Sequence, residues 1–335
     1  MTNFFKILFF NTLMMGTLIS ISSYSWFSMW MGLEINLLSM IPLMVGKSIF
    51  SSESALKYFI TQTLASSVIL FSIIMMSNTK EFIPQNSNYF LVMMMNSALL
   101  TKLGAAPFHS WFPEVMEGIN WTNCLIMLTW QKIAPMILIM YNLKMNVFFT
   151  SIIIFSALVG SIIGLNQISL RKIMAYSSIN HISWMIASMH SYSTWVIYFL
   201  IYCIITANIV LLFYKNKIYW LSQITNTYSQ SKHFKMAFMM NFLSLGGIPP
   251  FLGFFPKWIT INLMVNCKFY MMSFILIVLT LLTMFFYLRI TFSTLTIYAK
   301  ESLIQKNKMN LFLMNFYSMI SLCGLFMCTL IPNLN

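Results

Sequence analysis

Apolar runs of about twenty residues recur along the whole of this 335-residue chain, and they restrict its fold more than any other feature. Because a helix rises 1.5 Å per residue, about twenty apolar residues cross the roughly 30 Å of hydrocarbon in a bilayer. Only 7% of the residues are charged, whereas soluble domains carry about a quarter. No polar stretch is long enough for an extramembrane domain. The sequence therefore predicts one all-α, polytopic membrane domain over residues 1–335.

The apolar runs and the Pro/Gly positions between them predict eleven transmembrane helices. These cover residues 3–21, 25–45, 55–77, 88–118, 121–142, 148–166, 172–190, 193–214, 237–265, 270–291 and 311–331. The first could be a signal peptide, but its run is too long and lacks a small-residue cleavage motif. The fourth and ninth are too long for one straight crossing. Each contains a break, "GAAPF" (104–108) and "GGIPPFLGF" (246–254).

The basic residues test this count, because loops that are not translocated across the membrane carry an excess of Lys and Arg. Eleven crossings place thirteen of them on one face: Lys6, Lys47, Lys57, Arg171, Lys172, Lys215, Lys217, Lys232, Lys235, Arg289, Lys300, Lys306 and Lys308. The other face receives only Lys80, Lys144 and Lys268. The split predicts an N-terminus on the positive side and a C-terminus on the opposite side.

The two breaks lie five spans apart, and an odd offset predicts an inverted repeat. Residues 1–147 would be the first five-helix repeat, 148–292 the second, and 293–335 a connecting loop with the last helix. Paired, interrupted helices in corresponding halves mark midplane sites in ion-moving proteins. Two unrelated kinks are the alternative.

The residue types exclude several other functions. The five cysteines (Cys124, Cys203, Cys267, Cys323 and Cys328) form no CxxC pair, and no histidine has metal-ligand spacing. No GxGxxG follows a strand, so a dinucleotide site is not expected. The net charge of +13 is scattered over short loops rather than gathered in one patch, which argues against nucleic-acid binding. We therefore expect this chain to bind no metal or redox cofactor.

Four charges fall well inside predicted spans, away from the span ends: Glu34, Lys102, Lys132 and Lys257. A charge at mid-membrane costs about 2.5–3.5 kcal/mol on insertion scales, so it normally faces the protein interior and has a partner. A structural ion pair is the simplest explanation for one such charge. One glutamate cannot neutralise three lysines, so the surplus favours a functional role.

Lysine is suited to proton transfer because burial disfavours its charged form, whereas arginine stays charged. An adjacent carboxylate such as Glu34 would hold the proton on Lys102, and its withdrawal would release that proton. Each helix break exposes backbone groups that can hold ordered water beside Lys102 or Lys257. The pattern predicts a proton pathway.

Histidines and further charges have weaker assignments. His181 lies in mid-span among polar residues, and we expect it to relay protons in the second half, although a satisfied interior histidine is the alternative. His109 and Glu114 follow the first break and could form the pathway mouth or brace it. Arg171 and Lys172 read as topology anchors.

Five blocks resemble a known family: "GLEINLLSMIPL" (32–43), "KLGAAPFHSWFPEVMEG" (102–118), "LTWQKIAP" (128–135), "SLRKIMAYSSINHISW" (169–184) and "FLSLGGIPPFLGFFPKW" (242–258). The chain resembles mitochondrial NADH:ubiquinone oxidoreductase chain 2, and its register looks like that of the insect members. The resemblance runs over essentially the whole chain. It implies an antiporter-like, proton-translocating subunit of the membrane arm of respiratory complex I, in the mitochondrial inner membrane.

In that family the key glutamate and the lysines of the two broken helices and the connecting helix match Glu34, Lys102, Lys257 and Lys132. The resemblance also implies that the matrix is the positive side, and that NAD, FMN, iron–sulfur clusters and ubiquinone are bound by partner subunits. Neighbouring antiporter-like subunits and lipids such as cardiolipin would surround the chain. The second half departs from the pattern because it has no clear acidic partner for Lys257, so His181 or a neighbouring subunit would complete that site.

Two other functions remain open at this point. A free-standing antiporter would exchange a cation such as sodium for protons, using a similar set of lysines. A structural scaffold would use the same charges only to lock helices together.

Overall fold

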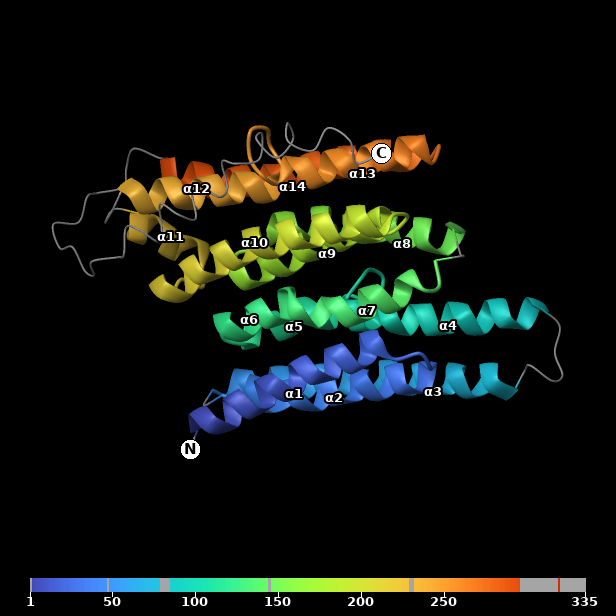
Figure 1. Cartoon of the computed structure of the whole chain (residues 1–335). Coiled ribbons are helices and arrows are strands. Elements are labelled where there is room, and N and C mark those ends of the chain that lie inside the picture. Colours follow the sequence, from blue (N-terminus) through green and yellow to red (C-terminus); the bar gives the residue numbers. More distant parts are fainter. Residues whose placement is uncertain are drawn as a thin grey trace. The chain divides into compact units, whose positions relative to one another are not determined.

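The computed structural model describes residues 2–46, 48–78, 85–143, 146–228 and 232–295, together with Met319. Within these ranges the chain forms helices joined by short turns, and an isolated bridge pairs Ser169 with Trp220 (Figure 1). Apart from Met319, the predicted last span (311–331) lies outside the described residues. So do six basic residues used in the charge count: Lys47, Lys80, Lys144, Lys300, Lys306 and Lys308.

The chain divides into two compact units, residues 1–152 and 153–335. The first contains α1 (Thr2–Ser22), α2 (Trp26–Met44), α3 (Ile49–Asn78), α4 (Gln85–Leu103), α5 (Trp111–Gly118), α6 (Trp121–Leu128) and α7 (Trp130–Met140). The boundary falls within α8 (Asn146–Ile162). The second unit continues with η1 (Ile163–Asn166), α9 (Leu170–Ser188), α10 (Tyr192–Asn216), α11 (Leu221–Tyr228), α12 (Lys232–Gly246), α13 (Phe254–Asn266) and α14 (Tyr270–Leu295).

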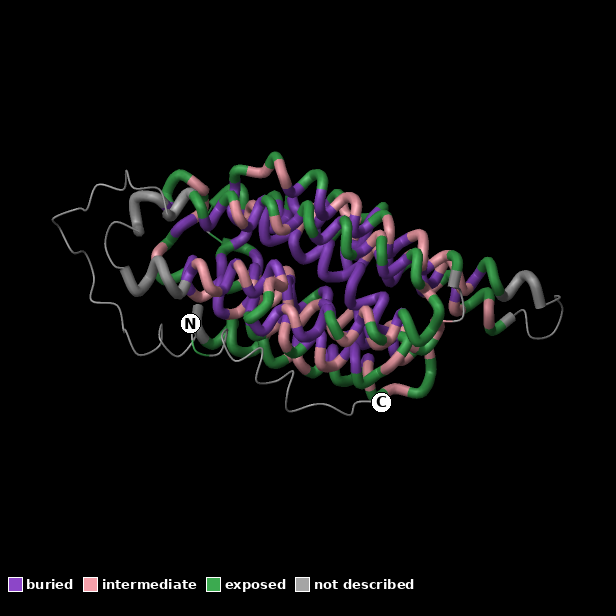
Figure 2. The backbone as a smooth tube through the Cα atoms, turned by 90° about the horizontal axis from the view of Figure 1, so that it is seen from above, coloured by how far each residue is buried: buried purple, intermediate pink, exposed green. Residues whose placement is uncertain are grey.

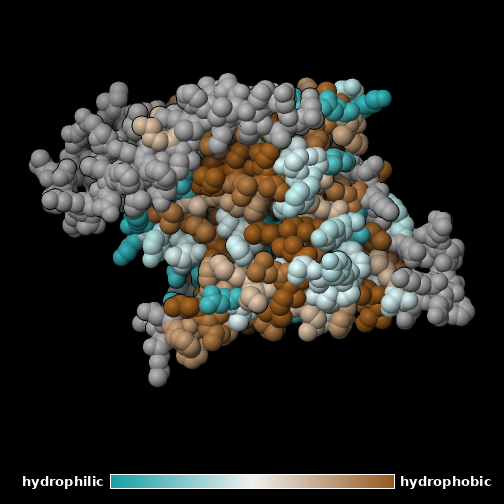
Figure 3. All heavy atoms as spheres, viewed as in Figure 1, coloured by the Kyte–Doolittle hydropathy of each residue, from teal (hydrophilic) through white to brown (hydrophobic). Residues whose placement is uncertain are grey.

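Seven helical stretches among the described residues are long and apolar enough to cross a membrane. Large hydrophobic side chains such as Phe50, Leu64 and Phe274 are exposed on them. Figure 3 shows hydrophobic residues over broad parts of the described surface in view. A water-soluble protein would cover such area with polar groups, whereas lipid accepts it. These features support a multi-pass membrane protein.

Helix α9 is the exception in composition, because it carries Ser177, Ser178, Asn180, His181 and Ser183. Nearly all of its side chains are nonetheless buried, and Figure 2 shows buried residues gathered where helices face one another. Its serine hydroxyls donate to carbonyl oxygens one turn back in the helix. A polar helix is therefore accommodated by protein neighbours rather than by lipid.

Two helix pairs approach closely through small residues. A Cβ on Gly16 would lie 2.9 Å from the backbone nitrogen of Asn36, so α1 and α2 meet there almost backbone to backbone. A Cβ on Gly160 would lie 2.8 Å from the backbone nitrogen of Asn180, at the crossing of α8 and α9. Small residues at helix crossings permit this approach in membranes. The two crossings fix the places of Asn36 and Asn180.

Three features differ from the predicted spans. Helix α3 begins at Ile49, six residues before the predicted start, because a polar N-terminal turn precedes its apolar run. The predicted span 121–142 is interrupted at Thr129, between α6 and α7. The short helix α11 was not predicted, since its eight residues carry no long apolar run.

Candidate functional site

The first unit contains a small polar cavity that brings two of the predicted lysines together. It has a volume of about 20 Å³, and a cavity needs only about 10–15 Å³ to hold a water molecule. Residues from α2 to α7 line it: Leu33, Asn36, Leu37, Tyr58, Gln62, Lys102, Leu103, Trp111, Phe112, Met127, Gln131, Lys132 and Pro135. Lys102 and Lys132 thus share a space with room for about one water molecule.

Lys102 lies in the last turn of α4, immediately before the predicted break, and its side chain is 8% exposed. The helix ends because Gly104 takes a left-handed φ of 74°, and the amides of Gly104 and Ala105 donate back to Thr101 and Leu100. The position at a helix C-terminus favours a cation through the helix dipole. Among the described residues, Lys102 Nζ has no hydrogen-bond acceptor.

Glu34 lies on α2, near this cavity. Its carboxylate is close enough to interact electrostatically with the Lys102 ammonium and the Tyr58 hydroxyl. Its Oε1 is buried and has no hydrogen-bond partner. No ion pair of 4.0 Å or shorter joins it to Lys102 within the described part of the chain. Glu34 is therefore within electrostatic range of Lys102 but forms no direct ion pair with it among the described residues.

Lys132 is the most buried of the three lysines, at 2% exposure. It lies in the first turn of α7, directly after the interruption at Thr129, and its Nζ is 5.9 Å from the centre of the Phe112 ring. Pro135, one turn later, has no backbone N–H, so the carbonyl of Gln131 has no helical donor. Sequence reasoning missed this third discontinuity, although Pro135 within the run was its signal.

Lys257 lies in the second unit, in the first turn of α13 after the other break. Its Nζ donates a 2.7 Å hydrogen bond to the carbonyl of Gly246, the last residue of α12. A Cβ on Gly247, whose φ is 80°, would come within 2.9 Å of the Lys257 side chain. The lysine is therefore held at a helix C-terminus, where carbonyls and the dipole favour a cation. The hydrogen-bond partner of Lys257 is thus a backbone carbonyl, which the search of the sequence for an acidic side chain could not identify.

His181 lies on α9, the helix whose Trp184 ring is near Lys257. Its Nδ1 is 2.9 Å from the Tyr198 hydroxyl, and the Tyr202 ring lies beside it at 5.1 Å between centres. Trp184, one turn along α9, has its ring 5.9 Å from Lys257 Nζ. Helix α9 therefore carries both the histidine and the aromatic side chain that contacts the lysine. The tyrosines were not identified from the sequence, because no motif marks them.

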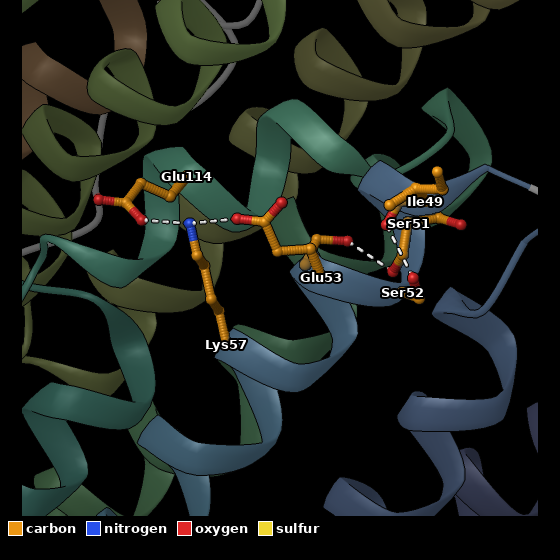
Figure 4. A network of polar contacts seen from close by, with 7 residues as sticks. Ile49, Ser51, Ser52, Glu53, Lys57 and Glu114 are labelled. Atoms are coloured by element: carbon orange, nitrogen blue, oxygen red, sulfur yellow. Dashed lines mark hydrogen bonds and ion pairs between the residues drawn. The ribbon is translucent and has the colours of Figure 1, made fainter.

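The remaining predicted residues lie outside the cavity. Glu114 is exposed, and Lys57 Nζ lies 2.9 Å from both Glu114 and Glu53, as Figure 4 shows. His109 Nδ1 is 3.3 Å from the carbonyl oxygen of Pro107. Contacts of this kind can brace the first break as readily as they could line the mouth of a pathway. Arg171 stacks its guanidinium on the Tyr219 ring at 4.8 Å.

The two breaks have the same local geometry. Gly104 and Gly247 both take a positive φ, and in each break the glycine amide donates to the residue three positions earlier. The next amide, of Ala105 or Ile248, donates five positions back in both. The helix then restarts after the same interval, at Trp111 and Phe254. The break sequences "GAAPFHSWFPE" and "GIPPFLGFFPK" align over this stretch without a gap.

Comparison with known proteins gives the family. Residues 23–283 match the family model described as NADH:quinone oxidoreductase/Mrp antiporter, TM. NADH-ubiquinone oxidoreductase chain 2 of Anopheles gambiae is 48% identical, with 97% of each chain covered. The protein of the same name from Locusta migratoria is 44% identical over 98% of this chain and 96% of its own. The predicted resemblance, including its insect-like register, is confirmed.

Solved structures share the fold. A chain in the structure of respiratory complex I from Thermus thermophilus with bound aureothin superposes with a TM-score of 0.87 at 21% identity, covering 98% of this chain and 80% of that one. A chain of the Mrp complex from Dietzia sp. gives a TM-score of 0.80 at 14% identity, over 95% of this chain and 74% of its own. The family model and the relatives above show that the chain belongs to the NADH:quinone oxidoreductase/Mrp antiporter family of membrane subunits, and within it to the chain 2 group.

Proposed function

We propose that this chain translocates protons as an antiporter-like subunit of respiratory complex I. The observation that carries the proposal is the cavity shared by Lys102 and Lys132, with Glu34 in electrostatic range of Lys102. Two buried lysines around space for a water molecule are an arrangement that can pass a proton. Membership of the family supports the same function.

In this proposal Glu34 sets the charge state of Lys102. With the carboxylate near, the ammonium is favoured; when the carboxylate moves away or is neutralised, Lys102 releases its proton to water in the cavity. Lys132 takes the proton from that water. Lys257 and His181 then complete the relay in the second half, where the Gly246 carbonyl stabilises the charged lysine.

The topology forms part of the proposal. We infer eleven transmembrane helices, an inverted repeat of residues 1–147 and 148–292, and a final segment 293–335. Support comes from the like geometry of the two breaks and from the crossings at Gly16 and Gly160. From the charge distribution we infer an N-terminus in the matrix and a C-terminus in the intermembrane space.

Redox chemistry would take place elsewhere in the complex. We propose that NAD, FMN, iron–sulfur clusters and ubiquinone are bound by partner subunits. Among the described residues, no three His, Cys, Asp or Glu side chains gather as metal ligands. Neighbouring antiporter-like subunits, other membrane-arm subunits and lipids such as cardiolipin are the expected contacts of the apolar surface.

The test is Lys102→Met in an assembled complex reconstituted into vesicles. We expect normal assembly with proton pumping reduced at least about tenfold, because a proton-exchanging group is lost. Pumping at the wild-type rate would contradict the relay and favour a scaffold.

A second candidate is a free-standing cation/proton antiporter, because the family model that residues 23–283 match covers Mrp antiporters as well as NADH:quinone oxidoreductases. The purified chain alone, in vesicles with a sodium gradient, distinguishes the two. We expect no proton movement from the isolated chain, whereas sodium-dependent proton movement would support the antiporter.

A further inference from the structure

A hydrogen-bonded amide pair forms part of the wall of the Lys102 cavity. Gln131 Nε2 donates to Asn36 Oδ1 at 2.7 Å, joining α7 to α2. Both residues line the cavity together with Lys102 and Lys132. Gln131 directly precedes Lys132, so this bond fixes the start of the helix that carries the second lysine.

Asn36 is buried and held at a close helix crossing. Its side chain is 3% exposed, and its backbone lies at the close crossing with Gly16. Ser39 Oγ donates to its carbonyl at 2.8 Å. An amide carries both donors and acceptors and does not titrate, so it can orient a water molecule without competing for the proton.

The same arrangement occurs independently in the second unit. Gly160, Tyr176 and Asn180 follow Gly16, Gly32 and Asn36 at one constant interval, and a Cβ on either Gly16 or Gly160 would meet the corresponding backbone atoms. Ser183 Oγ donates to the carbonyl of Asn180, as Ser39 does to that of Asn36. Asn180 Nδ2 reaches Thr283 Oγ1 on α14 at 3.5 Å, while its Oδ1 is buried without a hydrogen-bond partner.

The titratable neighbours of the two asparagines differ. At the same interval Glu34 corresponds to Ser178 and Leu37 to His181. The proton-binding group therefore changes from one half to the other, while the asparagine, its crossing glycine and its serine stay. If Asn36 served only as an electrostatic partner of Glu34, we would not expect an asparagine at the corresponding position 180, because residues 148–292 contain no glutamate.

We propose that Asn36 and Gln131 are a positioning pair for proton transfer between Lys102 and Lys132, orienting the water that carries the proton, and that Asn180 has the corresponding task in the second half. This inference rests on the proposed proton translocation and deepens it. Neither amide exchanges the proton itself.

The test uses Asn36→Leu, Gln131→Met and the double variant in assembled complex I in vesicles. Each single change keeps the approximate volume and removes the amide. We expect NADH-driven pumping per complex to fall about tenfold, since a misplaced relay is costly, with a larger solvent deuterium isotope effect. The double variant should pump no more slowly than the slower of the two single variants, because both changes break the same hydrogen bond. Ser72→Ala, which removes a buried hydroxyl of α3 outside the cavity wall, is the control and should pump normally.

Unchanged pumping and an unchanged isotope effect in the assembled variants would overturn the inference. A lower amount of complex with normal pumping per complex would also overturn it, because it shows a purely structural bond. Should Asn36→Leu prevent assembly, Gln131→Met decides, since Gln131 lies on α7 and belongs to neither helix of the α1–α2 crossing. Lys102→Met, measured in parallel, separates the two proposals. If it pumps normally, the proposed function fails; if it alone stops pumping, only the positioning role fails.

Discussion

The two units stabilise a buried lysine in different ways. In the first, Lys102 has a carboxylate in electrostatic range and, among the described residues, no direct acceptor. In the second, Lys257 is bonded to the Gly246 carbonyl, and residues 148–292 contain no acidic side chain at all. A side chain can move or be neutralised, whereas a helix-end carbonyl stays fixed and uncharged. From this comparison we propose that the charge of Lys102 is regulated, whereas that of Lys257 is constant.

The largest contrast should appear at the acidic position itself. We expect Glu34→Gln to lower pumping per complex by about tenfold or more, because the group that sets the charge of Lys102 is lost. The matched change Ser178→Ala, at the corresponding position of the second unit, should stay within about twofold. Pumping and NADH oxidation of the reconstituted complexes measure both. Equal effects of the two changes would contradict the division between a regulated and a constant lysine.

The next contrast uses the two break glycines. Gly104→Ala and Gly247→Ala each place a side chain at positive φ, which costs about 1–3 kcal/mol of stability. The new Cβ at residue 247 would also meet Lys257, whereas that at residue 104 would meet Phe112 at 3.1 Å. We therefore expect similar losses of thermal stability but a larger loss of pumping for Gly247→Ala. The reverse order would show that the carbonyl bond of Lys257 is not needed.

A smaller effect is expected at the histidine of the second unit. Tyr198→Phe removes the hydroxyl bonded to His181 Nδ1, and we expect pumping to fall roughly threefold, as for the loss of one hydrogen bond. Tyr192→Phe, an exposed tyrosine on the same helix, is the control. Identical rates for the two variants would remove His181 from the relay.

The smallest effect should come from the exposed ion pairs. Lys57→Ala removes the two ion pairs drawn in Figure 4, but charges on an exposed surface are screened and contribute little. We expect pumping to change less than about twofold. A loss as large as that of Glu34→Gln would make this cluster the pathway mouth rather than a brace.

The sequence was sufficient for the class of fold and for most of the unusual residues. Apolar length gives the membrane helices, and Gly/Pro positions locate both breaks, because each has a direct physical effect on a helix. A charge inside an apolar run stands out in the sequence because its insertion into a membrane costs free energy. Glu34, Lys102, Lys132 and Lys257 are therefore identified without a structure.

The parts that could not be predicted involve groups without a sequence signature. The partner of Lys257 is a backbone carbonyl, which every residue carries. The Asn36–Gln131 bond joins residues far apart in the chain, and neither residue is unusual by itself. The tyrosines around His181 become significant only through tertiary packing.

The most direct measurement of the central claim is the number of protons pumped per NADH by an assembled Lys102→Arg complex. Arginine keeps the positive charge but does not release its proton, so a structural role would survive while proton exchange would not. Lys57→Arg, at the exposed ion pair, is the control. We predict a lower proton yield for Lys102→Arg and an unchanged yield for the control. A wild-type proton yield from Lys102→Arg would contradict this prediction.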